Sequence, residues 1–214
     1  MSDAHMIAGN QPMHMPGHSG ELVEQSPFAL PSKKLAIWLF IIADAATFAA
    51  VLVAYGFIRN ADPNWPRPFH SIANVAPMTF ILLTSSLTML LGVQAAYAGR
   101  KKTAVRWVLF TAFLAAIFAL LHIREWVGLI NEGLSMSKNP WGGSQLFGAT
   151  FFGVTGLHLL HVIGGFVVLL YVTARYNSGH YDANHVETAG LYWHFVDLVW
   201  MFVVPLVYLL NFSR

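Results

Sequence analysis

Five long apolar runs, separated by polar breaks, occupy most of this 214-residue chain. Each run is longer than the ~20 residues that an α-helix needs to cross about 30 Å of hydrocarbon. A segment in a bilayer must satisfy its own backbone hydrogen bonds, and a helix does so without a neighbour. We therefore predict an all-α integral membrane protein. Its bundle of five transmembrane helices spans roughly residues 35–58, 75–99, 104–130, 146–174 and 188–211.

The composition agrees with a surface that faces lipid. Apolar residues make up 56% of the chain and charged residues only 10%, whereas roughly a quarter of the residues of a soluble domain are charged. The formal net charge of +2 comes without a dense basic patch, which argues against nucleic acid as a partner. The chain has no Cys, so disulfides, iron–sulfur clusters and thiolate copper sites are excluded.

The chain divides into a polar N-terminal tail at 1–32, rich in His and Met, and a five-helix transmembrane domain at 33–214. We expect little regular structure in the tail. Its side chains that could bind copper by ligand type are His5, Met13, His14, Met15 and His18. We assign no metal site to the chain, and copper binding by this tail stays the alternative.

Basic residues in the breaks predict the orientation of the chain. A cytoplasmic N-terminus would leave seven Lys and Arg residues inside and four outside. The inner residues are Lys33, Lys34, Arg100, Lys101, Lys102, Arg106 and Arg175, and the outer ones are Arg59, Arg67, Lys138 and Arg214. Because cytoplasmic loops carry the excess of basic residues, we predict a cytoplasmic N-terminus and a C-terminus on the opposite side.

Few ionisable side chains fall inside the predicted helices. A charge there is costly, so each should face protein or water and have a partner. The intramembrane polar residues are Asp44, Glu125, His158, His161 and Asp197. His158 and His161 are three residues apart, as are His194 and Asp197, so each pair can share a helix face. From spacing alone, these residues could form interhelical hydrogen bonds, bind metal or haem, or relay protons.

Two motifs in the last third of the chain resemble one family. Residues 155–165 read TGLHLLHVIGG, and Glu187 is followed at 192–200 by YWHFVDLVW. They look like the TGxHxxHVxxG helix and the ExxxxYWHFVDxVW signature of subunit III of cytochrome c and quinol oxidases, which are haem-copper oxidases. Glu125-Trp126 fits the family's E-[YW] pair. Asp44 stands where the family commonly has Glu.

The resemblance covers residues 33–214 and implies a non-catalytic subunit of a terminal oxidase in the aerobic respiratory chain, where O2 reduction is coupled to proton pumping. Many members have seven helices, and this chain is similar to short bacterial forms without the first two. The implied location is the bacterial cytoplasmic membrane, with the C-terminus in the periplasm. The electron donor, cytochrome c or quinol, stays undecided.

The resemblance also implies partners and ligands. Subunit III of the family binds no haem or copper, packs against the catalytic subunit I, holds phospholipids in a cleft and supports proton uptake. Haem and copper would lie in partner subunits, and the further partners would be subunit II and a small subunit IV or a supercomplex. By analogy, the candidate residues for binding lipid or lining the cleft are Arg175, Glu187 and His194.

Two other functions are open from the residues alone. The first is a b-type cytochrome with haem between pairs of histidines, for which the chain offers His122, His158, His161 and His194. A Soret band from haem bound to this polypeptide alone would favour it. The second is a proton channel or transporter with a relay of Asp44, Glu125 and Asp197. The sequence has no inverted repeat, which argues against a transporter.

Overall fold

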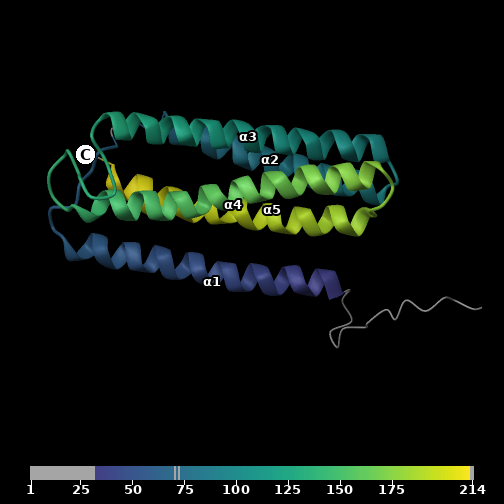
Figure 1. Cartoon of the computed structure of the whole chain (residues 1–214), viewed down its shortest axis with the longest axis horizontal. Coiled ribbons are helices and arrows are strands. Elements are labelled where there is room, and N and C mark those ends of the chain that lie inside the picture. The colour runs from purple at the N-terminus through teal and green to yellow at the C-terminus, as the bar shows by residue number, and fades with distance from the viewer. Residues whose placement is uncertain (1–31, 70, 72, 213–214) are drawn as a thin grey trace, which may run out of the picture.

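The computed structural model describes residues 32–69, 71 and 73–212. Five α-helices run along its long axis (Figure 1). They are α1 (Ser32–Ala61), α2 (Val75–Tyr97), α3 (Lys101–Asn131), α4 (Leu146–Asn177) and α5 (Ala183–Val203). All five are long and apolar enough to cross a membrane, and the described residues form no strand beyond one isolated bridge between Phe69 and Phe212. The predicted all-α fold with five spanning helices is confirmed.

The last helix differs most from the predicted bounds. It begins at Ala183 and not at 188, because Asp182 caps its N-terminus. The Asp182 side chain accepts a hydrogen bond from the backbone N–H of His185 (3.2 Å), and the His185 side chain closes a capping box. Glu187 therefore lies inside α5, not in front of it. Helix α3 also begins earlier than predicted, at Lys101, and α4 continues to Asn177.

The C-terminal end of α5 changes its hydrogen-bond pattern. One turn of π-helix covers Val204–Tyr208, and a 3-10 turn over Leu209–Asn211 follows. Pro205 lies in the first turn of the π-helix, and a proline has no backbone N–H to continue the α-helical pattern. The altered turn places Tyr208 and Asn211 in the interior, where both are buried.

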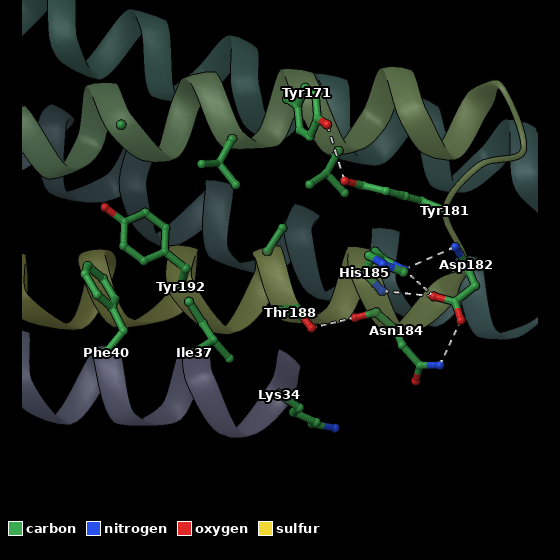
Figure 2. Close-up of a pocket in the computed structure, with 14 residues that line it drawn as sticks. Lys34, Ile37, Phe40, Tyr171, Tyr181, Asp182, Asn184, His185, Thr188 and Tyr192 are labelled. Carbon is green, nitrogen blue, oxygen red and sulfur yellow. Dashed lines mark hydrogen bonds and ion pairs between the residues drawn. The ribbon is translucent and has the colours of Figure 1, made fainter. Parts of the chain in front are cut away.

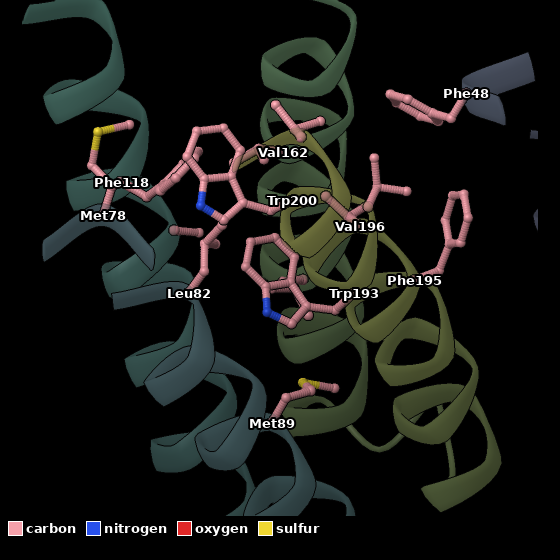
Figure 3. Close-up of a cluster of buried hydrophobic side chains, with 14 of the residues drawn as sticks. Phe48, Met78, Leu82, Met89, Phe118, Val162, Trp193, Phe195, Val196 and Trp200 are labelled. Carbon is pink, nitrogen blue, oxygen red and sulfur yellow. The ribbon is translucent and has the colours of Figure 1, made fainter. Parts of the chain in front are cut away.

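Helices α2 to α5 form a packed group, and α1 lies along one side of it, next to α4 and α5 (Figure 1). The core of the group contains the indoles of Trp193 and Trp200, two residues of α5 whose side chains lie between the other helices (Figure 3). Each indole N–H is satisfied by α2: Trp193 donates to Ser85 Oγ (3.0 Å) and Trp200 donates to Thr79 Oγ1 (3.1 Å). Aromatic packing and hydrogen bonds between α5 and α2 therefore hold the core together.

Helix α1 contacts the group through a narrow seam. Its best-buried apolar residues are Ile41, Phe48 and Tyr55, which follow one another at intervals of seven residues. Asp44 lies between the first two, on the same side. A repeat of this spacing keeps one stripe of a helix against its neighbour, as in a coiled coil. The other sides of α1 do not contact the described protein and expose mostly Ala and large apolar side chains.

Candidate functional site

A groove of about 1040 Å³ lies between α1, α4 and α5 (Figure 2). Its walls are apolar, and the residues that form them include Ile37, Phe40, Val168, Val172 and Ala189. Gly164 adds to the space on the α4 side, because it has no side chain. The groove exists because α1 touches α4 and α5 only along its seam.

Polar residues gather at the end of the groove nearest the turn between α4 and α5. They are Lys34, Tyr181, Asp182, Asn184, His185 and Thr188. Asp182 Oδ1 lies 2.6 Å from His185 Nδ1, and Asn184 donates to Asp182 Oδ2 at 3.1 Å. The hydrogen bond from His185 holds the pKa of Asp182 below its ordinary value. The groove is thus amphipathic, with a hydrogen-bonding mouth and an apolar interior.

Lys34 at this mouth is bound to Glu187, one of the residues predicted to contact lipid. Lys34 Nζ lies 2.7 Å from Glu187 Oε1. The second oxygen of the Glu187 carboxylate accepts a hydrogen bond from the Tyr97 hydroxyl at the end of α2. Glu187 therefore joins α1, α2 and α5 beside the groove, and it is not among the residues that line it.

The other two predicted cleft residues also lie outside the lining. The Arg175 guanidinium lies 5.6 Å from the centre of the Tyr181 ring, a cation–π contact. Arg175 therefore contacts a residue of the mouth without lining the groove itself. His194 turns toward α2, where its Nδ1 lies 2.6 Å from Ser86 Oγ. Lipid contact by Arg175, Glu187 and His194 stays a prediction. Of the two motifs, only Gly164 and Tyr192 line the groove, and neither was among the predicted cleft residues.

A carboxylate–imidazole pair lies just beyond the apolar end of the groove. Asp44 Oδ2 on α1 is 3.1 Å from His161 Nε2 on α4, and both side chains are less than one-fifth exposed. His161 Nδ1 is 2.7 Å from the carbonyl of Leu157. A carbonyl only accepts hydrogen bonds, so Nδ1 carries a proton. Nε2 lies within ion-pair distance of Asp44 Oδ2, although the two atoms do not meet the geometry of a hydrogen bond.

The remaining intramembrane carboxylates have separate surroundings. Glu125 accepts a hydrogen bond from the Tyr208 hydroxyl (2.7 Å) at the far end of α5. Asp197 Oδ1 is buried without a hydrogen-bond partner among the described residues, while Ser86, which contacts His194, also bonds to the carboxyl group of Asp197. No chain of hydrogen bonds through the described part of the protein joins Asp44, Glu125 and Asp197. The proton relay therefore has no support in this geometry.

The histidines do not form the sites that haem or metal would need. His158 faces the core and stacks on Trp200 at 5.0 Å between ring centres, whereas His161 faces α1. A haem between His122 and His158 would have to displace Trp200, which packs against both rings. The described residues contain no group of three or more potential metal ligands. The tail candidates His5, Met13, His14, Met15 and His18 lie outside the described residues.

Three further side chains, near the end of α1 and in the last 3-10 turn, form a contact that sequence reasoning missed. Arg59 on α1 donates to Asn211 Oδ1 (3.0 Å) and to the carbonyl of Leu210 (2.7 Å). The Asn211 amide donates in turn to the hydroxyl of Tyr55. Only the seven-residue spacing of Tyr55 from other apolar residues of α1 could have indicated that it faces the protein.

These features define a multi-pass helical membrane protein with an amphipathic lateral groove. The family model described as cytochrome c oxidase subunit III matches residues 26–212. The chain therefore belongs to the cytochrome c oxidase subunit III family, and it is subunit III of a haem-copper oxidase. The resemblance seen in the two sequence motifs is confirmed.

Relatives from three organisms agree with this assignment. The chain is 32% identical to a cytochrome bo(3) ubiquinol oxidase subunit 3 of Pseudomonas aeruginosa, across 81% of this chain and 83% of the relative. It is 33% identical to a probable cytochrome c oxidase subunit 3 of Nocardia farcinica, across 80% and 84%. A haem-copper oxidase subunit I+III of Aeropyrum pernix is 29% identical across 91% of this chain and 24% of the relative.

Proposed function

We propose that this subunit III takes no direct part in oxygen reduction and instead binds phospholipid in the groove between α1, α4 and α5. In that role it packs on subunit I, supports proton uptake by the complex and contributes to a respiratory chain. Haem and copper belong to the partner subunits. Subunit II and a small subunit IV or a supercomplex are further proposed partners.

The shape and chemistry of the groove carry the proposal of lipid binding. Its volume of about 1040 Å³ lies at the upper end of the ~300–1,000 Å³ of most small-molecule sites. The charged and amide groups lie at one end, near Lys34 in the first turn of α1. The walls beyond it are mainly apolar, with the Tyr192 hydroxyl bound to the carbonyl of His161. Ten residues separate Lys34 from Asp44, which is about 15 Å of helix. Such a groove fits a head group at the mouth and an acyl chain along the helices.

The contacts of the polar residues support a non-catalytic role. His161 contacts Asp44 of α1, His194 contacts Ser86 of α2, and Glu125 and Glu187 are bound by tyrosine hydroxyls. These contacts join helices to each other. The packing on subunit I is supported by the relative from Aeropyrum pernix, whose name combines subunits I and III in one chain.

A pair of glycine substitutions on α4 tests the groove. A side chain at Gly164 would enter the groove, and its Cβ would meet only the Tyr192 hydroxyl at 3.7 Å. We expect Gly164→Leu to assemble into the complex but to retain less phospholipid, measured by mass spectrometry of the purified oxidase. Its activity should then decline faster during sustained turnover than that of the wild type.

The matched control is Gly153→Leu on the same helix. A Cβ at Gly153 meets nothing within 4 Å, and this residue does not line the groove. The control should retain wild-type lipid and sustained activity. Equal phospholipid content in the two variants would contradict lipid binding in the groove.

The proposed orientation places the mouth of the groove at the cytoplasmic side of a bacterial membrane. The chain has no Cys, so one introduced thiol reports the side on which it lies. Ser178→Cys, between α4 and α5, should resist a membrane-impermeant maleimide in intact cells and react in inverted vesicles. Ser137→Cys, between α3 and α4, should do the opposite. The reverse labelling pattern would contradict the proposed orientation.

A further inference from the structure

Three neighbouring side chains in the core hold most of the buried polar atoms that lack a partner in the described part of the chain. Nine buried side-chain nitrogen and oxygen atoms of the described residues lack a hydrogen-bond partner, and five of them belong to this cluster. They are both ring nitrogens of His122, both of His158 and the indole nitrogen of Trp126. His122 and Trp126 lie on α3, and His158 lies on α4. Buried polar groups nearly always have a partner, so this concentration needs an explanation.

The aromatic packing brings the two imidazoles to one place. Both are fully buried. The ring centres of His122 and His158 lie 5.5 and 5.0 Å from Trp200, and 5.6 and 5.9 Å from Phe118. Trp126 meets His122 edge-on at 5.6 Å. Figure 3 shows Phe118 and Trp200 meeting at the centre of the core.

None of the surrounding groups can satisfy these nitrogens. The Trp200 N–H already donates to Thr79, and the carboxylate of Glu125 binds Tyr208. A neutral imidazole has one N–H donor and one acceptor, and the described structure has no hydrogen bond between the two histidines. The pair therefore needs a small ligand that both donates and accepts.

We propose that a buried water molecule bridges one ring nitrogen of His122 and one of His158, with the Trp126 N–H as a third donor to it, which satisfies three of the five atoms. A water can accept from the N–H of one imidazole and donate to the free nitrogen of the other. Buried waters typically make about three hydrogen bonds to such groups. A metal cation fits less well, because no carboxylate of the cluster would balance its charge in the apolar core. The bridge ties α3 to α4 independently of any lipid in the groove.

A high-resolution map of the intact wild-type oxidase tests the position of the water. We expect a single peak of water height within about 2.7–3.2 Å of one ring nitrogen of each histidine. A map without such a peak would overturn the proposal. So would a peak accompanied by metal in excess of the catalytic centres, measured by elemental analysis of the same sample. This measurement does not depend on any variant.

A double-variant cycle tests whether the two imidazoles share one ligand. His122→Leu and His158→Leu should each lower the midpoint temperature of dissociation of the purified complex, by about 2–4 °C. The double variant should lose clearly less than the two shifts combined, because it removes both groups that need the water. The control cycle pairs His158→Leu with His194→Leu, which contacts Ser86, and should be additive. Additive shifts in the first cycle would also overturn the proposal.

Discussion

Helix α1 and the group α2–α5 are held in place by different contacts. In the most apolar window of α1 only 6% of the residues are buried, whereas 39% are buried in α2, α3 and α4 and 50% in α5. Helix α1 is instead attached by polar contacts at three depths, through Lys34, Asp44 and Arg59. In lipid, helices gain little from apolar contact alone, so close packing and polar contacts decide their association.

The difference explains how a groove can persist inside a membrane bundle. A helix packed as closely as α5 would fill the space beside Gly164 and Val168 with its own side chains. Polar contacts hold α1 at fixed points, and between Lys34 and Asp44 the side chains of Ile37 and Phe40 border the groove. The proposed lipid site is thus a consequence of the way in which α1 is attached.

The largest loss of stability should come from a substitution in the closely packed group α2–α5. An added Cβ at Gly148, near the start of α4, would lie 1.9 Å from the backbone oxygen of Ser135. The backbone cannot move aside as a flexible side chain could, so Gly148→Ala should destabilise the protein by about 3 kcal/mol. We expect little assembled complex in the membrane, measured by immunoblot of native gels. Gly153→Ala, which meets nothing within 4 Å, is the control. Equal yields of the two variants would mean that this contact is not tight.

The next effect should come from the deepest attachment of α1. Asp44→Leu leaves His161 without its partner in a site of low exposure, which should cost about 2 kcal/mol. Asp44→Asn should be close to neutral, because its amide N–H can donate to Nε2 of a neutral imidazole. The measurement is the midpoint of dissociation of the purified complex. If Asp44→Asn destabilises the complex as much as Asp44→Leu, the contact requires a charge on both partners. The attachment of α1 would then depend on an ion pair, in contrast to the close packing that holds α5.

The five helices could be predicted from the sequence because each needs only a long apolar run, which is a local property. The start of α5 could not, because the capping box uses His185 where Glu or Gln is usual. The polar stretch before residue 188 therefore looked like a loop. The switch to π-helix at Val204 has a visible cause in Pro205, but its length depends on the packing of Tyr208.

The site was less predictable because its contacts join distant parts of the chain. Glu125 and Tyr208 are 83 residues apart, and Lys34 and Glu187 are 153 apart. Motif spacing paired His194 with Asp197, but a serine of α2 competes for the imidazole. The groove lies between α1 and the distant pair α4 and α5, and no periodicity within one helix indicates such a space. The family motifs identified the protein without indicating where its groove lies.

A smaller effect should come from the polar turn at the mouth of the groove. Asp182 caps α5, so Asp182→Ala should cost about 1 kcal/mol at neutral pH. The pKa of Asp182 is lowered by His185, so the carboxylate contributes above its ordinary pKa and the contribution is lost as the pH falls through the lowered value. Hydrogen exchange at the first amides of α5 should therefore be faster in the variant at pH 7, and the difference should shrink in acid. Asp62→Ala, in the opposite loop, should leave these amides unchanged. A difference that is constant with pH would contradict the role of the carboxylate.

The smallest loss of stability should come from the attachment of α1 through Lys34, a lysine–glutamate pair that is more exposed than the contact of Asp44 with His161. The side chains of Lys34 and Glu187 are 28% and 25% exposed, and such pairs contribute about 0.2–1 kcal/mol. Lys34→Met should therefore accelerate exchange in the first turns of α1 by a small factor, and added salt should reduce the difference from the wild type. Lys102→Met, at an exposed residue of α3, is the control. A loss as large as that of Asp44→Leu would mean that α1 is anchored chiefly at the end that carries Lys34. Depth in the membrane would then not decide the strength of its polar contacts.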